Sequence, residues 1–244
     1  MRDSEFGAML ALDDRHWWYR GRRLIVRAVL DGVRLAPGAR LLDAGAGSGR
    51  TLDELTRYGS VAGVELNPRG VEAALARGHG DVRVAPVEAI PHPDASFDLV
   101  TCLDVIEHTD DDVRSLRELR RVTRPGGAAL VTVPAYPRLW SQHDEVNGHR
   151  RRYTRRTLRA AAERAGWRVE RMTSFNAVYL LPAAVVRIAR RGPRADGGAS
   201  ELALTPPALN GLLELPLRAE AALIARGVRL PAGLSLLALL RAAS

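Results

Sequence analysis

The sequence predicts an α/β fold in which residues 1–244 form one domain around a parallel sheet. Short apolar segments of strand length alternate with segments of helical periodicity, and the first apolar segment ends in an acid and a glycine-rich turn. Strands that alternate with helices at this spacing form βαβ units, whose strands lie parallel. At this length, one domain with an insertion is favoured over two domains.

The first two thirds of the chain predict five strands and the helices between them. Residues 8–34 have helical periodicity, and Pro37-Gly38 separates them from the first strand. Asn67-Pro68 offers a capping side chain and then a proline at the first helical position, so a helix begins there. A further helix is capped by Thr109 or Asp110. The predicted strands begin at Leu41 and then span 61–64, 82–85, 97–103 and 128–133.

The last third predicts one more helix and strand, and then a long interruption before the final strand. Thr154 begins a helix that Gly166 ends, and a strand follows at 167–175. Residues 177–230 are helical and apolar, and the final strand spans 234–240. The expected organisation is an N-terminal helical cover at 8–34, a core at 39–176, a helical insertion at 177–230 and the last strand within 231–244.

The composition excludes several classes of protein. All 36 basic residues are arginine, and the abundance of Ala, Arg, Gly, Leu and Pro points to GC-rich codons, so part of the net charge of +8 is a codon effect. No recognition helix or stacking module accompanies that charge, and we expect no nucleic acid partner. The single cysteine, Cys102, excludes an internal disulfide, and the charged N-terminus does not resemble a signal peptide. We therefore expect a cytoplasmic protein.

The turn at 43–49, Asp-Ala-Gly-Ala-Gly-Ser-Gly, carries the clearest functional signal. Its glycines permit backbone angles and a close ligand approach that side chains would prevent. A carboxylate beside bare backbone suits a ligand with an ammonium group and a nucleoside, such as S-adenosylmethionine (SAM). A dinucleotide fingerprint needs its third glycine three positions after the second, where Arg50 stands. A nicotinamide or flavin site and an ordinary glycine-rich turn are the alternatives.

From Leu41 to Phe175 the chain resembles the Methyltransferase-11/UbiG-like group of class I SAM-dependent methyltransferases. The resemblance rests on the glycine turn, Glu65 after the second strand, the motifs at 87–91 and 96–100, and the segment 103–108 after the fourth strand. It implies a Rossmann-like, seven-stranded, mostly parallel sheet with helices on both faces. The last two strands of that fold normally form a simple hairpin, so residues 177–230 are a helical insertion before the last strand, which is expected to roof the acceptor pocket.

The resemblance also implies the cofactor contacts. Glycine backbone lies against the methionine part of SAM, and the Glu65 carboxylate accepts hydrogen bonds from both ribose hydroxyls. Many relatives bind the adenine amino group through an acid where this chain has Pro86, so the two following residues or packing must hold the adenine. Arg23 or Arg20 of the N-terminal cover pairs with the methionine carboxylate. The expected cofactor-binding residues are Trp18, Arg23, Asp43, Gly45, Gly47, Glu65, Leu66, Val87, Glu88 and Leu103.

Asp104, Glu107 and His108 stand at i, i+3 and i+4, on one face of a turn. In ubiquinone-pathway O-methyltransferases the corresponding residues can hold a divalent metal that positions a catechol-type acceptor, and two carboxylates with an imidazole are suitable ligands. The same residues occur in metal-free relatives, where the Glu-His pair has a structural role. We expect no divalent metal.

Candidates for acid–base chemistry follow the fifth strand, at the carboxyl edge of the sheet. Methyl transfer from a sulfonium is an in-line displacement that depends on alignment, and a hydroxyl, enol or ring acceptor also benefits from a base. The first candidate for that base is His143, the second is His149 and the third is Asp104. Structural hydrogen bonding is the alternative role for a loop histidine. The expected acceptor contacts are Tyr136, Trp140, Arg152 and Tyr153.

Arginines are densest at 150–156 and recur at Arg187, Arg190, Arg191 and Arg194, beside apolar helical segments. Most belong to solvated surface, but one or two could clamp an anionic acceptor. Basic flanks on apolar helices also suit an anionic membrane surface, and therefore a lipid-linked acceptor and a peripheral position at the inner membrane face.

The sequence therefore predicts a SAM-dependent methyltransferase that methylates an O, N or C atom of a small-molecule or lipid-linked acceptor and releases S-adenosylhomocysteine (SAH). O-methylation is favoured by the likeness at 103–108, and C-methylation in secondary, natural-product metabolism comes second. Two alternatives belong to other classes: a SAM-binding protein without transferase activity, and an oxidoreductase that uses the same sheet with NAD.

Overall fold

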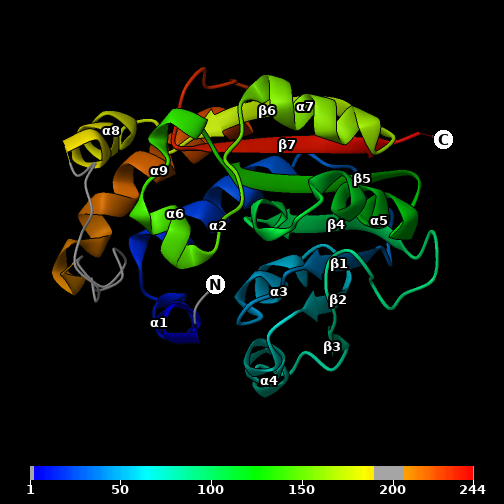
Figure 1. Cartoon of the computed structure of the whole chain (residues 1–244). Helices are drawn as coiled ribbons and strands as arrows, with labels where there is room; N and C mark the ends of the chain where they lie inside the picture. The colour runs from blue at the N-terminus through cyan, green and yellow to red at the C-terminus, as the bar shows by residue number, and fades with distance from the viewer. Residues whose placement is uncertain (1–2, 190–205, 244) are drawn as a thin grey trace.

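A seven-stranded sheet forms the centre of the computed structural model, which describes residues 3–189 and 206–243 (Figure 1). The strand order is β3-β2-β1-β4-β5-β7-β6, and β7 runs antiparallel to both of its neighbours while the other pairs are parallel. This confirms the predicted seven-stranded, mostly parallel sheet. The strands are β1 (Arg40–Ala44), β2 (Ser60–Glu65), β3 (Val82–Val84), β4 (Phe97–Leu103), β5 (Thr123–Pro134), β6 (Trp167–Phe175) and β7 (Ser235–Ala242).

Helices cover both faces of the sheet because successive strand side chains point to opposite sides. Leu41 of β1 packs in the cluster that contains α2 and α9, whereas Leu42 packs in the cluster that contains α5 and α7. The helices are α1 (Asp3–Leu12), α2 (Trp17–Leu30), α3 (Arg50–Leu55), α4 (Pro68–Ala76), α5 (Asp112–Val122), α6 (Gln142–Asn147), α7 (Arg155–Arg164), α8 (Leu180–Ala189) and α9 (Asn210–Ala225), with short 3-10 turns η1 (Ile106–His108), η2 (Pro137–Leu139) and η4 (Pro207–Leu209).

The N-terminal segment with helical periodicity at 8–34 contains the second half of α1 and all of α2, and α1 begins before residue 8. The chain turns between α1 and α2, and His16 caps α2 because its Nδ1 accepts a hydrogen bond from the Trp18 backbone N–H at 3.2 Å. The N-terminal cap predicted for α5 lies one or two residues too early in the sequence. The side chain of Asp111, rather than Thr109 or Asp110, accepts from the backbone of Arg114 and begins α5.

The segment at 177–230 contributes a helix to the layer that covers one face of the sheet. A β-carbon on Gly21 of α2 would lie 2.1 Å from Leu217 Cδ1 of α9, which shows how closely the two helices pack. Leu217 and Ile224 of α9 are fully buried in the core beside α2. No helix in the described part of the chain is long and apolar enough to cross a membrane.

Candidate active site

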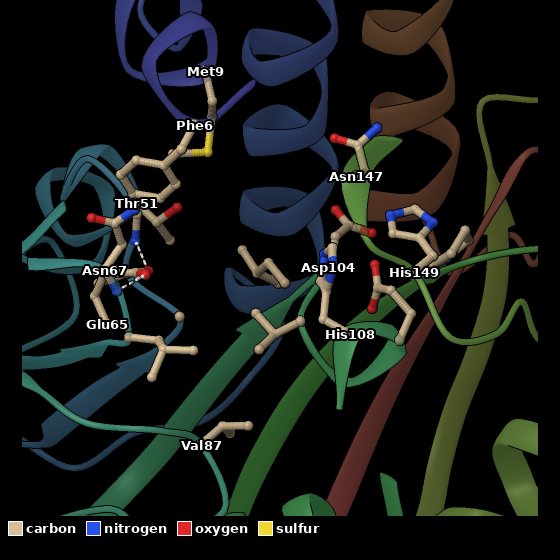
Figure 2. Close-up of a pocket in the computed structure, with 18 of the residues that line it drawn as sticks. Phe6, Met9, Thr51, Glu65, Asn67, Val87, Asp104, His108, Asn147 and His149 are labelled. Atoms are coloured by element: carbon tan, nitrogen blue, oxygen red, sulfur yellow. Dashed lines mark hydrogen bonds between the residues drawn. The ribbon is translucent and has the colours of Figure 1, made fainter. Parts of the chain in front are cut away.

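A cavity of about 960 Å³ opens at the carboxyl ends of β1, β2 and β4, and residues of α1 and α2 also line it (Figure 2). Figure 2 shows two groups of lining side chains. One group, with Glu65, Asn67 and Val87, belongs to the β1–β3 side, and the other, with Asp104 and His149, belongs to the β4–β5 side. We call these the turn half and the histidine half of the cavity. Ligands in open α/β sheets bind at this edge.

The glycine turn is shaped by close contacts as well as by backbone angles. Gly45, Gly47 and Gly49 all have positive φ, at +90°, +53° and +79°. A β-carbon on Gly45 would lie 2.3 Å from Val105 Cγ2, and one on Gly49 would lie 2.7 Å from Ala74 Cβ of α4. The early third glycine therefore allows the turn to pack on α4, and only glycine satisfies both requirements at these positions.

Glu65 orders the turn half. One carboxylate oxygen accepts a hydrogen bond from the Gly47 N–H and the other from the Asn67 N–H, each at 2.9 Å (Figure 2). Each oxygen retains a second acceptor position, so the carboxylate can still bind a pair of hydroxyl groups. Phe6 and Met9 of α1 line the cavity above this carboxylate. The predicted cofactor residues that line the cavity are Trp18, Gly45, Gly47, Glu65, Leu66, Val87, Glu88 and Leu103.

Two other predicted cofactor residues do not line the cavity. Asp43 is buried below the turn and accepts a hydrogen bond from Thr101 Oγ1 at 2.6 Å. Burial raises its pKa to about 7. Arg23 faces Asp13 and donates to its Oδ1 at 2.8 Å and to its backbone carbonyl at 2.9 Å, so its guanidinium ties α1 to α2. Of the arginines of α2, the one that lines the cavity is Arg22.

Arg22 connects α2 to the end of β4. Its Nη1 donates to Asp104 Oδ2 at 2.6 Å, and Asp104 adopts a positive φ of +58° directly after β4. Trp18 lies one helical turn earlier on the same face of α2 and its ring stacks on that of Phe175, with centroids 5.9 Å apart. The i, i+4 spacing from Trp18 would have identified Arg22, and not Arg23, as the residue facing the cavity.

The histidine half is centred on a buried carboxylate that does not line the cavity. Asp144 Oδ1 accepts from His149 Nδ1 at 2.8 Å and from Arg152 Nε at 2.7 Å, and its Oδ2 accepts from the Ser141 N–H at 2.9 Å. Burial opposes ionisation, but the His149 hydrogen bond and the Arg152 charge hold the pKa of Asp144 well below its usual range. Since Nδ1 of His149 faces Asp144, Nε2 is the ring nitrogen left for the cavity.

Three further side chains surround the His149 ring. His108 and His143 lie with ring centroids 4.8 and 6.1 Å from it. Burial lowers the pKa of His108 to about 4, so its imidazole is neutral at neutral pH. Glu107 is fully buried and lines the cavity, and neither carboxylate oxygen has a hydrogen-bond partner among the described residues. Burial, and then the nearby Asp104, raise the pKa of Glu107 well above its usual range.

The potential metal ligands differ from the predicted set. Glu107, His108 and His149 offer ligand atoms that all lie within 4.8 Å of one another. Asp104, which the sequence pattern grouped with the first two, is instead paired with Arg22. A carboxylate and two imidazoles are a reasonable donor set for a divalent cation.

Only one of the four predicted acceptor residues lines the cavity. Arg152 lines the cavity, but Tyr153 is buried and donates its hydroxyl to Asp112 Oδ2 at 2.9 Å. Tyr136 and Trp140 flank η2 and are not among the lining residues. The sequence interpretation missed Asn147 of α6 and Asn176 after β6, which do line the cavity. Neither belongs to a motif, and only the fold brings them to this edge.

The arginine run at 150–156 is largely structural. Arg152 is buried against Asp144, and Arg155 donates to Ser174 Oγ at 3.0 Å. Arg151 donates to the carbonyls of Thr109 and Asp110. Arg190, Arg191 and Arg194 lie outside the described residues.

A model of the methyltransferase domain family matches residues 42–131. A ubiquinone biosynthesis O-methyltransferase from Xanthomonas oryzae pv. oryzae is 35% identical over 146 residues, which are 53% of this chain and 60% of that protein. A ubiquinone/menaquinone biosynthesis C-methyltransferase UbiE from Geotalea daltonii is 32% identical over 136 residues, 51% of this chain and 54% of that protein. The chain thus spans little more than half the length of these curated relatives.

Solved structures share the fold at low identity. The complex between the Haloferax volcanii Trm112 activator and a methyltransferase matches with a TM-score of 0.65 and 20% identity, covering 99% of this chain and 96% of that chain. The [4+2]-cyclase SpnF matches with a TM-score of 0.60 and 20% identity, covering 93% and 82%. A cyclase on this fold shows that activity must be argued from the site. Residues 42–131 match the methyltransferase domain family, and the chain that carries them has the class I methyltransferase fold and is similar to ubiquinone biosynthesis O-methyltransferases over about half its length.

Proposed function

We propose that this protein transfers a methyl group from SAM to a hydroxyl oxygen of a small or lipid-linked acceptor, with His149 as general base. The proposal rests on the Asp144–His149 pair. Asp144 faces Nδ1 of His149, which leaves Nε2 for the cavity, and the glycine turn and Glu65 line the same cavity. One end of the cavity thus suits a nucleoside, and the other holds a base oriented by a buried carboxylate.

In the proposed complex the turn half holds SAM. The backbone of Gly45 and Gly47 lies against its methionine part, and the remaining acceptor positions of Glu65 receive the two ribose hydroxyls. Leu66, Val87 and Glu88 line the cavity next to this carboxylate and border the adenine. SAM supplies an electrophilic methyl group on a sulfonium, and its sulfur keeps the electron pair of the bond that breaks.

His149 acts on the acceptor. Its Nε2 takes the hydroxyl proton as the acceptor oxygen forms its bond to the methyl carbon, and the imidazolium that results is stabilised by ionised Asp144. Neutral His108 and the Glu107 carboxyl, whose pKa burial raises, line the cavity and can form hydrogen bonds with the acceptor. His143, the first candidate from the sequence, has its ring nitrogens 3.3 Å from Asn147 Nδ2.

Isothermal calorimetry with SAH and with NAD tests the cofactor, and we expect binding of SAH alone. SAH release from SAM with a panel of phenols, catechols and aliphatic alcohols then tests the base. We expect His149→Gln to retain SAH affinity and to lower turnover by about 10²–10⁴-fold, and His143→Gln to have a much smaller effect. Turnover that falls only in His143→Gln would transfer the role of base to that histidine. SAH binding without turnover of any acceptor would instead support a SAM-binding protein.

A further inference from the structure

The outer surfaces of α8 and α9 are unusually apolar for a protein surface. Eight of the eleven exposed large hydrophobic side chains in the described part of the chain lie between residues 178 and 228. We define the α8–α9 surface by six of them: Val178, Leu181, Val185, Leu209, Leu212 and Leu215. Leu181 is 75% exposed and Leu212 is 64% exposed. Large apolar side chains exposed in this number on two neighbouring helices point to a contact with a partner or a membrane.

The two helices are neighbours at the same end of the molecule (Figure 1), since the Tyr179 hydroxyl donates to the Leu213 carbonyl. In α9, two buried carboxylates and two exposed leucines accompany the buried Leu217 and Ile224. Glu214 and Glu220 point inward and are 2% and 5% exposed, while Leu212 and Leu215 point outward. Glu214 pairs with Arg20 and Arg218, and Glu220 accepts from the backbone after β6. An ordinary amphipathic helix exposes its carboxylates and buries its leucines.

The exposed charged side chains in the described part of 177–230 are arginines. Glu214 and Glu220 are the only acids in the described part of 177–230, and both are buried. Arg218 is 57% exposed along its side chain, and Arg226, Arg229 and Arg138 of η2 are exposed as well. Exposed apolar side chains on helices that carry exposed arginines complement anionic lipid headgroups over an apolar interior. A second copy of the same surface would place arginine against arginine, which disfavours self-association.

The α8–α9 surface also adjoins the cavity. The Trp17 ring lines the cavity and lies 4.7 Å from the ring of Tyr179, and the Trp17 N–H donates to Asn210 Oδ1 at 3.0 Å. The start of α8 and the start of α9 therefore meet at one lining residue.

We propose that the α8–α9 surface binds the surface of a bilayer that contains anionic lipids. The leucines and valines insert at the headgroup–acyl boundary while the arginines contact the headgroups. The cavity then opens near the headgroups, where an acceptor with an apolar anchor is located. Binding does not depend on methyl transfer, so the proposal can be tested without turnover.

Flotation of the full chain with phosphatidylcholine vesicles, with and without about 30% phosphatidylglycerol, tests the proposal. We expect binding only to the anionic vesicles, and a several-fold decrease when NaCl is raised to about 0.5 M. The variant Leu181→Ser/Leu212→Ser should bind about tenfold more weakly. The matched control is Leu75→Ser/Val84→Ser on α4 and β3, two exposed apolar residues outside this surface, which should bind like the wild type.

Three results would overturn the proposal. One is the absence of wild-type binding at low salt, and another is an equal loss in both variants. The third is a dimer, seen by sedimentation, that only Leu181→Ser/Leu212→Ser converts to a monomer, because the surface would then be a self-interface. Far-UV circular dichroism checks that each variant is folded, and Val185→Ser/Leu215→Ser replaces the first variant if it is not.

Discussion

The two halves of the cavity depend on different structural features. In the turn half, backbone geometry dominates: a run of glycines with positive φ and one carboxylate that accepts two backbone N–H groups. In the histidine half, buried charged side chains dominate, with Asp144 binding His149 and Arg152. Backbone geometry is determined by local sequence, whereas a buried charge network depends on segments that only the fold brings together. The two halves should therefore fail in different ways when they are mutated.

The largest effect is expected from Asp144→Asn in the histidine half. This change leaves the buried Arg152 guanidinium without a counter-charge, so the free energy of unfolding should fall by about 3–5 kcal/mol. Urea unfolding measures the change. The control is Asp110→Asn, whose carboxylate is 88% exposed and pairs with exposed Arg150, and which should cost at most about 1 kcal/mol. Equal losses in the two variants would contradict a buried charge network.

Gly45→Ala tests the turn half. The new methyl group would lie 2.3 Å from Val105 Cγ2 at a φ of +90°, so the turn must shift, and SAH affinity should fall about 100-fold, or about 2.7 kcal/mol. Gly78→Ala is a matched control because Gly78 has a φ of +93° and no atom near the site of a new β-carbon. It should lose about 1 kcal/mol of stability and no SAH affinity. Calorimetry that gives the same affinity for both variants would show that the contact is unimportant.

The pH dependence of SAM affinity tests Asp43, which connects the two halves below the turn. Its raised pKa means that the protonated form stabilises the fold fully below about pH 4, and that this contribution is lost as the pH rises through about 7. A sulfonium and an ammonium group nearby favour the ionised form, so SAM should bind up to about tenfold more tightly at pH 8 than at pH 6. In Asp43→Asn this dependence should disappear. A wild-type affinity that is constant over this range would contradict the coupling.

The smallest effect is expected from metal removal. Asp104 is held by Arg22 and His149 by Asp144, so we expect treatment with EDTA to leave turnover unchanged. Turnover is measured as SAH release before and after treatment. Loss of turnover that Mg²⁺ or Zn²⁺ restores would make Glu107, His108 and His149 a metal centre and would assign His149 a different role.

The sequence predicted the sheet well because its signals are local. The strands at 97–103 and 167–175 have the predicted bounds, and the glycine turn and Glu65 meet through hydrogen bonds. It did not predict which arginine of α2 faces the cavity. Arg23 is adjacent in sequence to Arg22, and only the orientation of α2 decides which of them faces the cavity.

The role of Asp144 could not be predicted from a sequence motif. Its role comes from partners that lie on other turns of the chain and from complete burial, and neither is visible in the letters around it. The interruption between α1 and α2 also depends on contacts that the local sequence does not show. The residues at 13–16 fit a helical pattern, but the Asp13 carboxylate is needed by Arg23 and the His16 side chain caps α2.

The single cysteine, Cys102, lies fully buried in the central strand β4, and burial raises the pKa of its thiol well above the usual value. A thiol reagent such as a maleimide can therefore reach it only when the middle of the sheet opens. The rate at which this one thiol is labelled therefore measures how often the sheet opens. A ligand that binds only the closed form decreases the labelling rate by a factor of 1 + [L]/Kd. The affinities of candidate nucleosides and acceptors can therefore be ranked without an assay of turnover.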